Sequence, residues 1–153
     1  MRLALYEPDI PQNTGAILRL ASCFSVNVDI IEPCGFIFSN RRLKRSGMDY
    51  IDTVNIKFHS SWQTFFNKQN MDEKVRIILL TTKGFTNYID FEFQYNDILL
   101  LGRESAGVPE AVHIAVDASI TIPMAPETRS LNIATSAAIV LGEALRQTDA
   151  YPK

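Results

Sequence analysis

Two segments near the end of the chain combine the residue types of a ligand-binding site. Residues 99–110 pass from an apolar run into Gly102 and Glu104, and residues 120–132 pass from another apolar run into polar residues that include Ser130. Apolar runs that stop abruptly at polar, turn-forming residues are typical of strands followed by loops. Because an open α/β sheet binds its ligands where loops leave the ends of its strands, we expect a binding site here.

The kind of ligand is narrowed by the motifs that these loops lack. Gly84 and Gly102 each follow a predicted strand, where a glycine lets a ligand approach the backbone, although each glycine taken singly is better explained by a turn of the chain. The sequence has no GxxxxGK(S/T) loop, and no GxGxxG follows its first predicted strand. It therefore disfavours a nucleoside triphosphate or a dinucleotide and favours a nucleoside-type ligand without a phosphate chain.

A third polar segment stands near the start of the chain. Residues 10–15, Asn13 among them, are predicted to form a polar turn. An amphipathic helix is predicted over residues 16–24, where apolar residues recur every three or four positions. Arg19 lies on the polar side of this helix, and a surface arginine would explain it without any function.

The order of the predicted elements indicates a parallel α/β sheet in a single domain, residues 1–153. The helix at 16–24 stands between apolar runs at 3–6 and 26–31, which makes a β-α-β unit with a right-handed crossover. Further strands are predicted at 54–58, 75–82, 97–101 and 120–122, and further helices at 40–47, 60–67 and 133–146.

Composition excludes several classes of protein. With 46% hydrophobic and 21% charged residues, the chain is expected to be globular and soluble. The formal net charge is -2, so contact with a nucleic acid requires a local basic patch or a partner subunit that doubles one. No apolar run approaches the roughly 20 residues that a membrane helix needs.

Cysteine and histidine usage gives no sign of a metal site or a disulfide framework. Cys23 and Cys34 match no zinc or CxxC spacing, and His59 and His113 share no helical face. The first eight residues lack the apolar core of a signal peptide. We expect two free thiols, no metal and a cytoplasmic location.

The three polar segments, taken in order, resemble the three motifs of the SpoU branch of the SPOUT RNA methyltransferases. Residues 13–15 with Arg19 are similar to the first motif, residues 101–109 to the second and residues 129–134 to the third. The resemblance covers residues 6–147 and is greatest to the minimal tRNA 2'-O-methyltransferases, which modify the wobble nucleotide and carry no extra RNA-binding domain. Three motifs in order, at suitable spacing, make the resemblance specific.

The resemblance implies features that composition and periodicity do not predict. The C-terminal part, about residues 75–150, would be tied in a deep trefoil knot, an exception to the rule that chains do not thread their own loops. The chain would form a homodimer whose active site draws residues from both subunits. The knotted loops would hold S-adenosylmethionine (AdoMet), in contact with Leu80, Gly102, Glu104, Ile122, Ser130 and Leu131.

Glu104 has two interpretations at this point. It is either a solvated loop carboxylate or partner of Arg103, or, by the resemblance, an organiser of the site near the cofactor or the motif arginine.

The resemblance also implies a role for Arg19. A ribose 2'-hydroxyl has a very high pKa, so methyl transfer requires removal of its proton or stabilisation of the developing charge. In this family an arginine at this position is proposed to accept the proton, although a permanent cation is a poor base and electrostatic stabilisation has equal weight. Asn13 and Asn132, with Ser130, could orient the ribose and this arginine by hydrogen bonds.

Two positions depart from the pattern of the wobble-type sequences. Thr135 replaces an asparagine, and Ala106 replaces an arginine while Arg103 adds one nearby. These changes put the choice of substrate in doubt more than the class of reaction. We therefore expect an AdoMet-dependent enzyme acting on the wobble nucleotide of tRNA. The alternatives are a knotted RNA-binding module without activity and a small α/β enzyme that uses another nucleotide.

The only dense basic cluster consists of Arg41, Arg42, Lys44 and Arg45. Such runs are usually a solvated face, but in an acidic chain this one is the natural place for phosphates, and we expect it to bind the tRNA anticodon arm.

Reversing the charge of Arg41 and Arg42 is predicted to weaken tRNA binding and to flatten its dependence on salt. Filter binding at several salt concentrations measures both quantities, and unchanged binding would contradict the assignment.

Overall fold

The computed structural model describes residues 1–38, 53–72 and 74–153, so the predicted basic helix and its cluster lie outside the described residues. The strands are β1 (Arg2–Tyr6), β2 (Asn27–Ile31), β3 (Ile56–His59), β4 (Ile77–Leu80), β5 (Thr86–Asn87), β6 (Ile98–Leu101) and β7 (Ala118–Thr121). The helices are α1 (Pro11–Cys23), α3 (Trp62–Gln69), α4 (Glu110–Ala115) and α5 (Ile133–Gln147).

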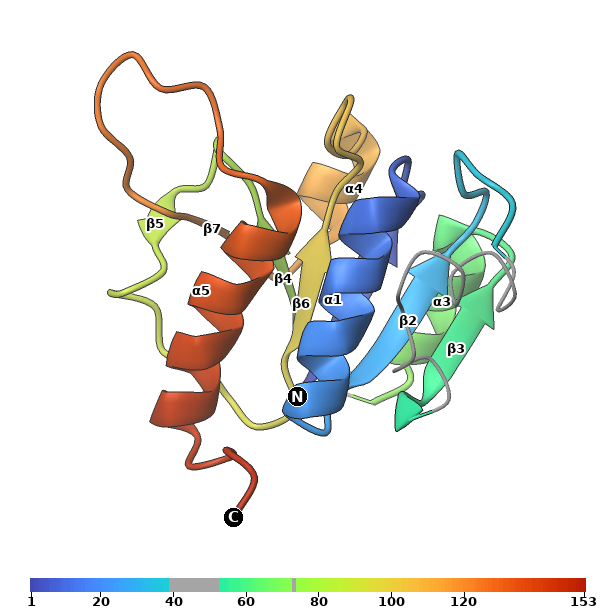
Figure 1. Ribbon diagram of the computed structural model, residues 1–153, viewed down its shortest axis with the longest axis horizontal. Helices are drawn as coiled ribbons and strands as arrows, with labels where there is room; N and C mark the ends of the chain where they lie inside the picture. Colours follow the sequence, from blue (N-terminus) through green and yellow to red (C-terminus); the bar gives the residue numbers. More distant parts are fainter. Residues whose placement is uncertain (39–52, 73) are drawn as a thin grey trace.

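The described strands form one seven-stranded sheet in the order β3-β2-β1-β6-β4-β7-β5, and every neighbouring pair is parallel (Figure 1). The predicted α/β class with a parallel sheet is thereby confirmed. Central strands such as β6 are buried along their whole length, as expected when helices cover both faces of a parallel sheet.

The two faces of the sheet are covered by different helices. Helices α1 and α5 pack side by side over one face, with Leu18 and Leu141 in the same hydrophobic cluster (Figure 1). On the other face, Phe65 of α3 and Val112 of α4 belong to a second cluster. Within the described part of the chain, no helix is long and apolar enough to cross a membrane.

The strand order brings the loops of interest to one edge of the sheet. Strand β6 lies between β1 and β4, and β4 lies between β6 and β7. The register aligns their carboxyl ends, since Leu80 of β4 pairs with Leu101 of β6 and with Ile120 of β7. The loops that leave β1, β4, β6 and β7 therefore meet, as we predicted for the two C-terminal loops.

One prediction about local structure is wrong. Residues 10–15 do not form a polar turn before the helix, because α1 begins at Pro11 and includes Asn13 and Gly15. Proline is favoured at the first position of a helix, where its missing N–H is not needed and its fixed φ suits the helix. The other predicted strands, and the helices at 60–67 and 133–146, are confirmed to within a few residues, whereas β5 and α4 were not predicted.

The amino end of β6 is held by a buried ion pair. Asp97 is fully buried and accepts hydrogen bonds from Nε and Nη2 of Arg76, at 2.9 and 2.8 Å. The same carboxylate accepts a hydrogen bond from the backbone N–H of Gln94 at 2.8 Å. At the surface of α5, Arg146 forms a similar bidentate pair with Glu143, but its side chain is 67% exposed.

The two arginines give a stability prediction. Arg76→Ala leaves a buried carboxylate without its cation, and we expect the free energy of unfolding to fall by about 3 kcal/mol. Arg146→Ala removes a comparable pair at the surface, where water replaces the arginine, and we expect a much smaller loss. Urea unfolding of both variants measures the difference. Equal losses would show that burial of the carboxylate does not determine the effect.

Candidate active site

A cavity of about 560 Å³ opens at the carboxyl ends of β4, β6 and β7. Its walls come from the three loops that follow these strands and from the first turns of α1 and α5. The volume is within the range of small-molecule sites. All the residues predicted to contact a cofactor line it, and these are Leu80, Gly102, Glu104, Ile122, Ser130 and Leu131.

The loop after β6 is closed on itself. Arg103 and Gly107 exchange two backbone hydrogen bonds of 2.8 Å, and Gly107 has φ +67°, which favours glycine. A Cβ on Gly102 would lie 2.8 Å from the carbonyl carbon of Gly107. Gly102 is therefore required by the packing of the loop itself, whether or not a ligand approaches it.

Gly84, in the turn after β4, has a similar packing reason. A Cβ there would lie 2.3 Å from the carbonyl carbon of Ile120 in β7. The interpretation of these glycines as openings for a ligand is thus unnecessary, since turns and close chain contacts explain them.

A cluster of charges ties the loop after β6 to the loop after β1. Arg103 donates from Nη2 to Oδ1 of Asp9 at 2.8 Å and from Nη1 to Oε2 of Glu7 at 3.3 Å. The hydroxyl of Ser105 donates to the other oxygen of Asp9. Hydrogen bonds from Ser105 and then Arg103 lower the pKa of Asp9 below its usual range. The tie is therefore present at neutral pH and is lost as the pH falls through the lowered pKa.

Glu104 does not pair with Arg103, although both residues bond to Asp9. Its Oε2 accepts the backbone N–H of Asp9 at 2.9 Å, and its Oε1 accepts Nδ2 of Asn13 at 3.2 Å. It is thus neither a solvated carboxylate nor the partner of Arg103, and its contacts are those of an organiser of the first and second motif segments.

The contact continues to the third segment through two amides. Nδ2 of Asn132 donates to Oδ1 of Asn13 at 2.9 Å. Oδ1 of Asn132 accepts the backbone N–H groups of Ala134 and Thr135, at 2.9 and 3.3 Å, and so caps the amino end of α5. Glu104, Asn13 and Asn132 form one chain of hydrogen bonds, which we call the amide relay.

Both ends of the amide relay fix the orientation of its amides. Backbone N–H groups can only donate, so the oxygen of Asn132 must face α5 and its NH₂ must face Asn13. A carboxylate can only accept, so the NH₂ of Asn13 must face Glu104. The two requirements agree, and the relay has a single consistent direction from α5 to Glu104.

The structure does not bring Arg19 to this cavity. Arg19 is exposed and stands six positions after Asn13 on α1, which is a rotation of about 120° away from it on an α-helix. Asn13 and Asn132 both line the cavity, so two of the three predicted catalytic residues are brought together and the third is not.

Sequence reasoning missed Asp9 and Arg129. Asp9 receives Arg103 and Ser105, and only its position directly after a strand and Pro8 could have indicated it. Arg129 lines the cavity, and the signal that could have indicated it is its place in the third motif segment, directly before Ser130. Two positions depart from the wobble-type sequence pattern. Of these, Ala106 lines the cavity, whereas Thr135 contributes its backbone N–H to the cap of α5. The described residues contain no cluster suited to a metal ion.

Comparisons with known proteins agree with this geometry. The sequence profile of the SpoU rRNA methylase family matches residues 1–142. A tRNA (cytidine(34)-2'-O)-methyltransferase from Beijerinckia indica is 54% identical over 99% of this chain and 94% of its own length. A solved structure described as concerning 2-OH methylation of C/U34 on tRNA superposes with a TM-score of 0.88 at 35% identity, covering 95% of this chain and 94% of that one. The SpoU methyltransferase AviRb of Streptomyces viridochromogenes, solved with AdoMet, shares the fold, with a TM-score of 0.86 at 24% identity over 96% of this chain and 57% of that one.

The amide relay predicts that Asn13 and Asn132 stabilise the fold jointly. In a double-mutant cycle of Asn13→Ala and Asn132→Ala, measured by urea unfolding, we expect a coupling free energy of about 1 kcal/mol. Ser61 is a matched control, because its side chain also caps a helix, α3, by accepting the backbone N–H of Thr64. The pair Asn13→Ala and Ser61→Ala should be additive. Additivity of the Asn13 and Asn132 pair would contradict the relay.

Proposed function

The chain belongs to the SpoU methylase family, and from that premise we propose that it is a tRNA 2'-O-ribose methyltransferase acting on nucleotide 34. It is an AdoMet-dependent enzyme, and the methyl group goes to the ribose of cytidine or uridine at the wobble position. The observation that carries the proposal is that all three motif segments line one cavity and are held together by the amide relay.

The cavity suits AdoMet by the chemistry of its lining. Apolar side chains, including Leu80, Ile122 and Leu131, provide a slot for an adenine ring, and the backbone of the closed loop 102–107 provides polar groups beside it. The lining contains no phosphate-binding loop, in agreement with a nucleoside without a phosphate chain. When bound, the cofactor supplies an electrophilic methyl group on its sulfonium sulfur.

The acceptor side of the reaction is assigned to the amides. Asn13 and Asn132 lie at the cavity with their orientations fixed by the relay, so they can position a ribose hydroxyl without first having to reorganise. Glu104 holds Asn13 in place, which makes it a positioning residue in this proposal.

Arg19 is assigned to the cavity of a partner subunit. It is exposed on α1 and lies away from the cavity of its own chain, so a homodimer that brings α1 of one subunit to the cavity of the other would complete the site. There it would stabilise the developing alkoxide or accept its proton. The proposal includes a trefoil knot at about residues 75–150, a single domain over 1–153, binding of the tRNA anticodon arm and a cytoplasmic location.

The proposed methyltransferase and a small α/β enzyme that uses another nucleotide would bind different ligands. Calorimetric titration with AdoMet, ATP and NAD is expected to give binding of AdoMet alone. Tighter binding of ATP or NAD than of AdoMet would favour an α/β enzyme that uses another nucleotide. The absence of a phosphate-binding loop from the sequence disfavours that alternative.

The enzymatic reading is tested by methyl transfer from labelled AdoMet to total tRNA, with the modified nucleotide mapped by mass spectrometry. Arg19→Ala is predicted to lower kcat by about 100-fold or more while leaving the dissociation constant of AdoMet unchanged, since its role is in the chemical step. Lys68→Ala, an exposed cation on α3, serves as the control and should retain activity. If the wild-type protein transferred no labelled methyl group to any tRNA pool, the result would contradict the enzymatic proposal and favour an RNA-binding module without activity.

A further inference from the structure

The turn between β4 and β5 carries an apolar side chain that the fold does not use. Phe85 is 96% exposed, and Lys83, two positions earlier, is exposed as well. A single exposed apolar residue is common on protein surfaces and indicates nothing by itself. Phe85 differs from such residues in two respects: it lies beside the cavity, and its backbone is held by hydrogen bonds and strand pairing.

The backbone of the turn is held on both sides. The N–H groups of Lys83 and Gly84 bond to Oγ1 and the carbonyl oxygen of Thr81, at 3.2 and 3.3 Å. Gly84 packs against the carbonyl of Ile120, and the following strand β5 pairs with β7. Gly84 faces β7, whereas its neighbours Lys83 and Phe85 are both exposed to solvent.

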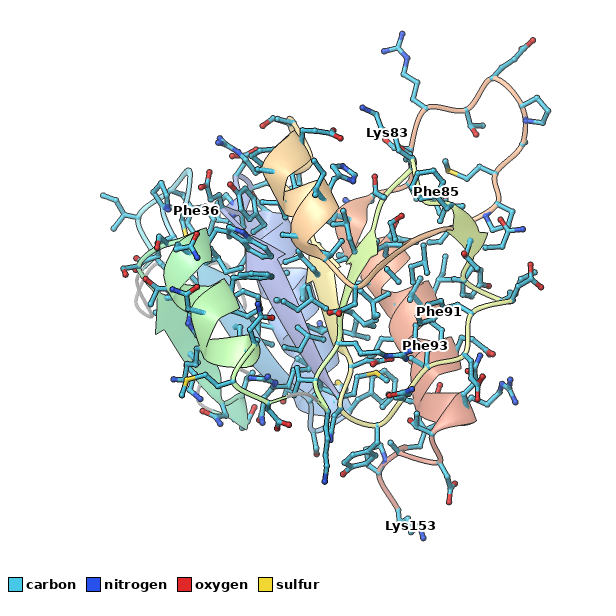
Figure 2. All side chains as sticks on the ribbon, turned by 180° about the vertical axis from the view of Figure 1, so that it is seen from behind. Phe36, Lys83, Phe85, Phe91, Phe93 and Lys153 are labelled. Atoms are coloured by element: carbon cyan, nitrogen blue, oxygen red, sulfur yellow. The ribbon has the colours of Figure 1, made fainter. Side chains whose placement is uncertain are left out.

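The turn stands at the mouth of the cavity. Thr81 and Thr82, directly before Lys83, line the cavity, and Arg129 lines it from the loop after β7. Figure 2 shows Lys83 and Phe85 beside that loop, in agreement with the pairing of β5 and β7. Among the described residues, neither Lys83 nor Arg129 has a carboxylate within salt-bridge distance.

The rim beside Thr82 therefore carries an exposed aromatic ring, Phe85, with Lys83 two positions before it, and Arg129 lines the same cavity from the loop after β7. A nucleotide that places its ribose in the cavity stays joined to its neighbours, whose bases and phosphates must cross the rim. Proteins recognise unpaired RNA bases by stacking them on aromatic rings and bind phosphates with lysine and arginine.

We propose that Phe85 stacks on an unpaired base of the tRNA anticodon loop next to the target nucleotide, while Lys83 and Arg129 contact the flanking phosphates. This inference rests on the proposed function and adds a substrate contact to it. A second copy of the chain is the other candidate to cover Phe85. The two cations at the rim favour RNA, because a partner subunit of net charge -2 offers no comparable row of anions.

Binding of total tRNA, measured by filter binding with S-adenosylhomocysteine present, tests the contact. Phe85→Ala is expected to raise the dissociation constant about tenfold and to leave the slope of its salt dependence unchanged. Phe85→Trp should restore binding, and Phe85→Leu should not, because leucine is apolar but cannot stack. Lys83→Ala should weaken binding and also lower the salt slope by about one.

Tyr95→Ala is the matched control, since Tyr95 is 66% exposed and precedes β6 at the opposite edge of the sheet. It should bind tRNA as the wild type does, and AdoMet affinity should be the same in every variant. Wild-type binding by Phe85→Ala or Phe85→Leu would overturn the proposal, as would a changed oligomeric mass of Phe85→Ala in light scattering. Wild-type protein that binds tRNA but transfers no methyl group would contradict the proposed function instead, and the Phe85 comparison would still decide this inference.

Discussion

The site depends on the hydrogen-bond chain from Glu104 through Asn13 to Asn132, which joins the loop after β6, the first turn of α1 and the N-cap of α5. Parallel strands align their carboxyl ends, but they do not fix the loops that follow. The amide relay does so with groups of fixed polarity, a carboxylate at one end and the free N–H groups of α5 at the other. Each amide therefore has one favourable orientation, and the cavity walls are set before any ligand arrives.

The relay is supported by a second tie that uses charge. Arg103 and Ser105 converge on Asp9, whose backbone N–H is bound by Glu104 between them in sequence. Three consecutive residues of the second motif segment thus hold the segment that precedes α1. This explains why the extra arginine at 103 is compatible with the family site, since its charge is used within the protein and is balanced by Asp9 and Glu7.

The parts of the fold that depend on local sequence could be predicted, and the parts that depend on distant contacts could not. The apolar run of β6 and the recurring apolar residues of α5 are local signals. The start of α1 was missed because Asn13 and Gly15 usually favour turns, whereas Pro11 and the contact with Glu104, 91 positions away, favour the helix. The sequence could predict that Arg19 lies on the polar side of α1. Which residues of α1 face the cavity depends on how the helix packs against the sheet, and the sequence pattern does not contain that information.

We infer that the cavity held by the amide relay is the cofactor site. Backbone NMR of the labelled protein, titrated with S-adenosylhomocysteine, tests it most directly. We expect the shifted signals to gather in residues 79–82, 101–108 and 121–133, with Asn13 among them. Shifts gathered instead at the opposite edge of the sheet, around Arg2, Val26 and Tyr95, or an absence of shifts at saturating ligand, would contradict it.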